Sequence, residues 1–219
     1  MAQKVRDAFM VQGRACEQLG SPFMARLMAL IGERLTRENA VGARCLDWEG
    51  EPGPSGNSVP LRLAGALHGL ILDGSAPPLA GVYPPNASTD DALWAEVERT
   101  IRVHETRILD WLGRAPQTNE VRRAAAIAAG IWWSLGEIGN RPLVLSELGA
   151  SAGLNLSLDR FSVAIDGVAH GPEDAIVQLV PEWRGAIRPK PRPLNIVDRR
   201  GVDLAPLDAA DPDDALRLD

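Results

Sequence analysis

Apolar side chains recur every three to four residues through most of the first 140 residues, the spacing that places them on one face of an α-helix. Segments rich in glycine and proline interrupt this pattern and predict an exposed loop at 49–57 and a second loop at 73–88. The pattern predicts helices at about residues 3–20, 22–35, 58–72, 88–112 and 119–138. The helix that begins at Ser88 or Thr89 is expected to be the longest. The last helix is apolar nearly all round, which predicts deep burial.

The pattern changes after Pro142. A short β-prone run at 143–145 is followed by a glycine-rich turn, and helical spacing resumes at Leu154. Residues 161–165 alternate like a strand and lead into an Asp-Gly turn. Two further segments are β-prone, at 176–180 and at 194–204, the second as one strand with a bend or as two strands.

These elements predict an α/β protein in which a mostly helical N-terminal region packs on the start of a Rossmann-like parallel sheet. The helical region covers residues 1–140, and the sheet covers 141–219 with a β-rich insertion at about 161–193. One or two parallel strands cannot bury both faces of a sheet. We therefore expect the sequence to be part of a longer chain, or alternatively the helical region and a partner to cover the sheet.

Charge and cysteine content narrow the classes of function. The chain has 23 Lys and Arg and 29 Asp and Glu, and its net charge of −6 disfavours general binding to nucleic acid or to an anionic membrane. Cys16 and Cys45 form no CxxC pair and are expected to be reduced thiols that fill space in a core. The first residues lead into no apolar run, and no stretch reaches the roughly 20 apolar residues of a membrane span. A cytoplasmic protein is expected.

The turn over residues 147–153 is the strongest candidate for a functional site. Gly149 and Gly153 allow a tight bend and let a ligand approach the backbone without an intervening Cβ. The helix expected from Leu154 onward directs free N–H groups and a partial positive charge at the turn, which favours a carboxylate or a phosphate. Glu147, at the end of the strand, is suited to hold a cationic group or an ordered water.

An acidic residue followed by this spacing of small residues after an apolar strand resembles motif I of the class I S-adenosylmethionine-dependent methyltransferases. The resemblance implies an S-adenosylmethionine cofactor, with the cofactor-binding residues Glu147, Gly149, Ala150, Ser151, Gly153 and Asn155. It also implies an acidic residue after the next strand that takes the ribose hydroxyls, for which Asp203 is the candidate and Asp198 the reserve. Asp203 lies roughly 50 residues beyond the turn, where about 20 is usual, so the resemblance requires an insertion. The methyl acceptor stays open.

The same turn contains Gly149-x-Ser151-x-Gly153, which is the nucleophile-elbow pattern of α/β-hydrolases. This alternative predicts an esterase-like enzyme in which Ser151 is the catalytic nucleophile. It requires strands and an oxyanion-donor loop before the turn, and an Asp and a His after it. The upstream region is helical and His170 is the only histidine after the turn, so the methyltransferase-like function is preferred.

A second alternative is a non-catalytic interaction protein that keeps a degenerate turn. Its glycines then serve only the packing of helix on strand. This alternative predicts that no small molecule binds and that an apolar patch is exposed where the missing part of the sheet would dock.

The whole chain also resembles a bacterial family known only as a domain of unknown function. The shared segments are those at 16–22, 117–120, 148–155 and 201–208. The resemblance implies no activity, but it suggests that Gln117, Asn119 and Glu120 face the same cleft as the glycine turn.

The histidines, the paired tryptophans and the basic loop predict a further functional site less strongly than the glycine turn does. The three histidines have no partner at metal-ligand spacing, so no metal site is expected. Trp132 and Trp133 are expected in the core. Residues 184–193 are basic and rich in proline, and they predict an extended loop whose charges are either solvated or bind an anionic substrate.

Overall fold

The computed structural model describes residues 1–117 and 120–218 and divides the chain into two compact units. Unit 1 comprises residues 1–116, and unit 2 comprises residues 117–218. The sequence pattern places the division near residue 140. The structure places the helix before that point in unit 2, because its apolar side chains pack on the strands of that unit.

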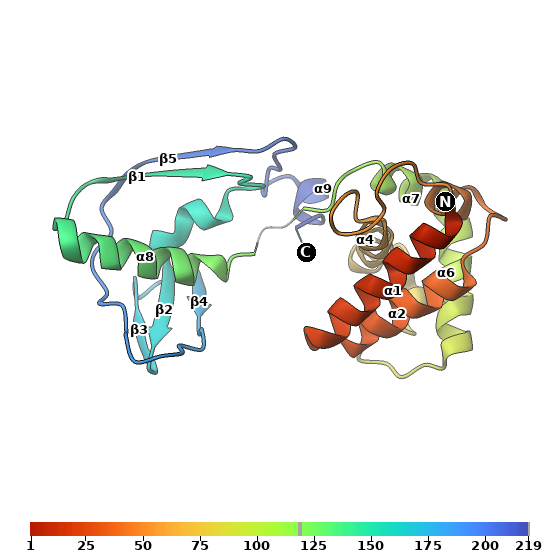
Figure 1. Ribbon diagram of the computed structural model, residues 1–219, viewed down its shortest axis with the longest axis horizontal. Helices are drawn as coiled ribbons and strands as arrows, with labels where there is room; N and C mark the ends of the chain where they lie inside the picture. Colours follow the sequence, from red (N-terminus) through yellow and green to blue (C-terminus); the bar gives the residue numbers. More distant parts are fainter. Residues whose placement is uncertain (118–119, 219) are drawn as a thin grey trace. The chain divides into compact units, whose positions relative to one another are not determined.

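Unit 1 is built from helices that pack their apolar stripes on one another. They are α1 (Ala2–Gln18), α2 (Pro22–Arg34), α3 (Ala40–Leu46), α4 (Val59–Leu72), α5 (Pro77–Ala80), α6 (Asp90–Val103) and α7 (Glu105–Leu112) (Figure 1). The α1 helix packs along α2, and α4 packs against α7. Phe9, Leu27 and Leu67 are fully buried in this core, as the periodic pattern predicts. The short α3 helix was not predicted, because seven residues are too few to establish a helical period.

The helix expected over 88–112 is divided in two, so the prediction of a single longest helix there is wrong. The α6 helix ends at Val103, His104 caps both helices, and α7 begins at Glu105. A tertiary contact accompanies the break, because the Glu105 carboxylate accepts a 2.9 Å hydrogen bond from the Ala40 amide at the start of α3. Both halves keep their apolar stripe buried, with Ile101 in α6 and Ile108 in α7.

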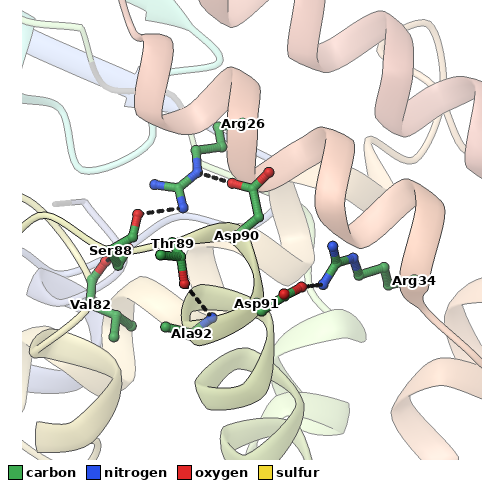
Figure 2. Close-up of polar contacts among 8 residues, drawn as sticks. All are labelled: Arg26, Arg34, Val82, Ser88, Thr89, Asp90, Asp91 and Ala92. Atoms are coloured by element: carbon green, nitrogen blue, oxygen red, sulfur yellow. Dashed lines mark hydrogen bonds and ion pairs between the residues drawn. The ribbon is translucent and has the colours of Figure 1, made fainter.

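The N-terminus of α6 is capped by Thr89, and two arginines of α2 pair with its first two residues (Figure 2). Thr89 Oγ1 accepts a hydrogen bond from the Ala92 amide at 3.2 Å, as an N-cap threonine does. Asp90 and Asp91 in the first turn complement the helix dipole. Arg26 pairs with Asp90 at 2.6 Å and Arg34 pairs with Asp91 at 2.8 Å, so the cap also joins α2 to α6 (Figure 2).

Replacing the Thr89 cap with alanine is expected to destabilise unit 1 by about 1 kcal/mol, because the Ala92 amide loses its acceptor. Urea unfolding followed by circular dichroism measures the change. Thr89→Ser keeps the hydroxyl and should recover most of the loss. Thr106→Ala, at an exposed position of α7, is the matched control and should change stability by less than about 0.5 kcal/mol. Equal effects of the two alanine variants would contradict the assignment of the cap.

Unit 2 combines helices with two small sheets, which confirms the α/β class. Its helices are α8 (Arg123–Ile138), the 3₁₀ helix η1 (Leu154–Arg160) and α9 (Pro212–Ala215). Its strands are β1 (Leu143–Leu148), β2 (Phe161–Ile165), β3 (Val168–His170), β4 (Val177–Leu179) and β5 (Ile196–Val202). The β1 and β5 strands pair in parallel, while β2 pairs antiparallel with β3 and parallel with β4. The segment predicted as one bent strand or two forms the single strand β5.

The core of unit 2 lies around α8, which Figure 1 shows between the β1–β5 pair and the sheet of β2, β3 and β4. Ala124, Ala128 and Trp132 form a buried stripe that packs on β2. The opposite side of α8 is solvent-exposed, with 55% of Trp133 accessible. The prediction that this helix is buried all round is therefore wrong for Trp133, because only one stripe of the helix faces the strands.

The chain that follows the glycine turn also differs from the prediction. In place of an α-helix it forms η1, a seven-residue 3₁₀ helix with a kink at Ser157. The β2 strand begins directly after Arg160, so no room is left for further helical turns. A short 3₁₀ helix carries only a small dipole, which weakens the anion-binding argument made from the sequence.

Candidate functional site

The parallel pairing of β1 with β5 brings two distant segments together. Leu143 lies opposite Ile196, and Leu148 lies opposite Val202. Because the strands are parallel, their carboxyl ends lie at the same edge of the pair. The glycine turn follows β1 at that edge and Asp203 follows β5, although they are far apart in sequence.

The backbone of the turn folds onto the end of β5. The amides of Gly149 and Ala150 both donate to the Val202 carbonyl, at 2.9 and 3.1 Å. Gly149 and Gly153 have a φ of +71°, a region open to glycine at little cost, and Ser151 has a φ of +51°. The turn therefore uses its glycines to bend, as expected, but its first amides bond to β5 and do not point at a ligand.

Asp203 joins the turn to the end of β5. Its Oδ2 accepts a hydrogen bond from the Ser151 amide at 2.8 Å, and its Oδ1 accepts one from the Ala205 amide at 2.9 Å. The Ala205 and Ser151 amides lower the pKa of the Asp203 carboxyl below its ordinary value, since they stabilise the charged form. The carboxylate is thus ionised at neutral pH and fixed in orientation, and each oxygen keeps a lone pair for a further donor.

Gly201 permits the close approach of the turn to β5. A Cβ at this position would lie 2.8 Å from the Ala150 Cβ and 3.1 Å from Leu156 Cδ1. Gly201 was not among the residues predicted for the site, although it stands two residues before Asp203. The signal that could have identified it is the pair of a strand-borne glycine and a nearby acidic residue, which indicates close backbone packing.

Gln117 joins the same cluster from the start of unit 2. Ser151 Oγ donates to Gln117 Oε1 at 2.8 Å, and Gln117 Nε2 donates to the Ala205 carbonyl at 3.0 Å. Gln117 therefore links the turn to the segment after β5. Asn119 lies outside the described residues, and Glu120 accepts a hydrogen bond from the Arg122 amide ahead of α8.

Two side chains near the turn keep polar atoms without a hydrogen-bond partner among the described residues. Asn155, in the first turn of η1, is 5% exposed, and its Oδ1 is buried without a donor. Glu147, opposite Gly201 at the end of β1, is half-buried, and its carboxylate makes no hydrogen bond to another described side chain. Both atoms are acceptors, so this edge of the strand pair is suited to a ligand group that donates hydrogen bonds.

The chain from residue 6 to residue 219 matches the model of a family described as "Uncharacterized protein conserved in bacteria (DUF2332)". The chain belongs to this family. The resemblance to a bacterial domain of unknown function is thereby confirmed, and the described turn, Gly201 and Asp203 all lie within the matched residues. No curated protein and no solved structure matches the chain.

The His, Cys, Asp and Glu residues of this family member form no cluster suited to a metal ion among the described residues. Cys45 is fully buried in unit 1, and burial raises the pKa of its thiol to about 12, so it is a neutral core residue. Over the described ranges, no helix has both the length and the apolar character needed to cross a membrane.

Proposed function

We propose that unit 2 is a Rossmann-like, methyltransferase-like unit that binds S-adenosylmethionine at the carboxyl ends of β1 and β5. One observation carries the proposal. The Asp203 carboxylate lies 2.8 Å from the Ser151 amide, so the acidic residue that the motif requires stands beside the glycine turn despite the long insertion. Ligands of open parallel sheets bind at this edge of the strands.

The side chains around the turn fit the polar groups of this cofactor. Asp203 is ionised and held by two amides, so its free lone pairs can accept the two ribose hydroxyls. Asn155 Oδ1 and the Glu147 carboxylate lack donors among the described residues, and they match the ammonium of the methionyl group. The bound cofactor supplies an activated methyl group, while the residues of this chain bind and orient it.

The first test is thermal unfolding with and without S-adenosylhomocysteine. A ligand at 100 times its Kd adds about 2.7 kcal/mol, which raises Tm by roughly 5–10 °C for a chain of this size. Asp203→Ala should abolish this shift, and Asp203→Asn should reduce it while retaining the size of the side chain. Asp198→Ala removes the pairing with Arg200 and the hydrogen bond from the Arg199 amide, both away from the glycine turn, and as the matched control it should leave the shift unchanged.

Two results of this experiment would contradict the proposed cofactor. Absence of a shift in the wild-type protein, or an equal shift in Asp203→Ala and Asp198→Ala, would contradict the proposed cofactor. If no small molecule of this class binds at all, the non-catalytic interaction protein becomes the better hypothesis.

The hydrolase alternative is favoured by one observation, the positive φ of Ser151, which is typical of a nucleophile elbow. Against it, Ser151 is 6% exposed, its hydroxyl donates to Gln117, and no described histidine bonds to that oxygen. A serine-reactive fluorophosphonate should therefore fail to label the chain. Labelling that disappears in Ser151→Ala would support the esterase-like function in place of the proposed one.

A further inference from the structure

A cavity of about 530 Å³ lies between α8, the sheet of β2 and β3, and the segment 191–194. Phe161, Val163 and Leu158 supply apolar surface to its wall. Its volume is within the range of small-molecule sites. The cavity shares no residue with the glycine-turn site, so a ligand bound in it is independent of the proposed function.

Three residues that line this cavity carry buried polar atoms without a hydrogen-bond partner in the described chain. They are Trp132 Nε1, Arg192 Nε and Asp159 Oδ1. Trp132 is 95% buried, since only 5% of its surface is exposed. An unpaired buried polar group is costly, so three such groups in residues that line one cavity point to a ligand that supplies the missing partners.

The unpaired atoms define what the ligand must carry. The indole N–H of Trp132 and the Nε–H of Arg192 are donors, and the second of these is cationic. They require an acceptor group, best an anionic one. The other carboxylate oxygen, Asp159 Oδ2, already accepts a hydrogen bond from Arg199 at 2.5 Å. Asp159 Oδ1 is an acceptor without a partner and requires a hydroxyl or N–H donor.

A second cavity of about 350 Å³ is also lined by Trp132 and Arg192, so these two residues border both spaces. Arg188, Lys190 and Arg192 place three cations on its wall, and Glu137 is its one carboxylate. Arg188 is paired with Asp166 at 3.0 Å. Lys190 and Arg192 therefore outnumber the Glu137 carboxylate, and this positive excess beside the shared residues favours an anion.

We propose that the larger cavity binds a small aromatic anion that also carries a hydrogen-bond donor. The anionic oxygens accept from Trp132 Nε1 and Arg192 Nε, the donor faces Asp159 Oδ1, and the ring packs on the apolar wall. These three polar atoms have almost no solvent-accessible surface in the structure, so the proposal requires the half-exposed Arg192 side chain to turn when the ligand binds. The shared chemistry is an aromatic acid, whose anion is either a carboxylate or a phosphate.

The test titrates the whole 219-residue chain with 4-hydroxyphenylacetate and with 4-hydroxyphenyl phosphate, and follows the indole ¹H–¹⁵N resonances by NMR. The resonance lost in Trp132→Phe identifies the Trp132 indole, and it should shift on titration. Trp132→Phe and Arg192→Met should each weaken binding about tenfold or more. The probe that binds more tightly distinguishes a carboxylate from a phosphate ligand.

Two controls make the result specific. Arg184→Gln removes a cation of the same segment that pairs with Glu182 and lines neither cavity, and it should leave the affinity unchanged. The neutral 4-hydroxyphenylacetamide should bind at least about tenfold more weakly than the acid. Absence of binding, equal binding of acid and amide, or unchanged affinity in folded Trp132→Phe and Arg192→Met would overturn the proposal.

Discussion

Replacing Gly42 with alanine should destabilise unit 1 by about 2–3 kcal/mol, although alanine is the better helix former. Gly42 lies inside α3, and its amide donates to the Asn39 cap at 2.8 Å. A Cβ on Gly42 would stand 1.9 Å from the Thr36 carbonyl oxygen, a backbone atom that cannot turn away as a side chain does. The overlap therefore forces α3 away from the preceding chain.

Urea unfolding measures this change, and amide hydrogen exchange locates it in α3. Ala40→Gly, at an exposed position of the same helix, is the matched control and should cost at most about 1 kcal/mol through helix propensity. If adding a methyl group at residue 42 stabilised the protein, the close packing of Thr36 on Gly42 would be disproved.

Replacing Gly201 with valine should destabilise unit 2 by about 2 kcal/mol and weaken S-adenosylhomocysteine binding more than about 100-fold. The added Cβ would overlap Ala150 Cβ, a rigid neighbour, and would press on Leu156. The turn must then leave the end of β5, which breaks the hydrogen bond between the Ser151 amide and Asp203.

Calorimetric titration of the ligand and urea unfolding of the variant separate the two effects. Gly130→Ala is the control in unit 2, because Gly130 lies in α8 with open space at its Cβ position. It should stabilise the protein by about 0.5–1 kcal/mol and leave ligand binding unchanged. Unaltered binding in Gly201→Val would show that the turn and β5 do not form one site.

Much of the local structure could be predicted from the sequence because it depends on short-range patterns. The period of apolar residues predicts α1, α2, α4 and α8, and of the two predicted starts of α6, Ser88 and Thr89, Thr89 is the cap. The alternation at 161–165 predicts β2, and the Asp-Gly pair after it forms the turn into β3. Each of these features is set within a few residues of the chain.

The predictions that proved wrong concern places where segments distant in sequence contact one another. His104 divides a continuous apolar stripe where Glu105 contacts α3, and no local pattern reports that contact. The sequence showed that the residues from Ala124 to Trp133 are apolar, but the strands that pack on α8 decide that Trp132 is buried and Trp133 is exposed.

In the candidate site, too, some features could be predicted from local sequence and others depend on tertiary contacts. Gly149 and Gly153 could be assigned to a turn from sequence, because a bend with positive φ requires glycine wherever it occurs. Asp203 could be nominated only by resemblance, and its contact with the Ser151 amide exists because β1 and β5 pair in parallel. The place of Gly201 against Ala150, and of Gln117 against Ser151, likewise results from that pairing.

The sequence by itself thus determined the helical character of the first unit, the strand β1 of the second and the position of the glycine turn that follows it. Only the tertiary structure decided which turn amides stay free, which side of α8 is buried and which polar atoms of Trp132, Arg192 and Asp159 lack partners. The physical reason is that backbone propensity and side-chain period act over a few residues. Burial and hydrogen-bond satisfaction depend instead on groups that the folded chain brings together.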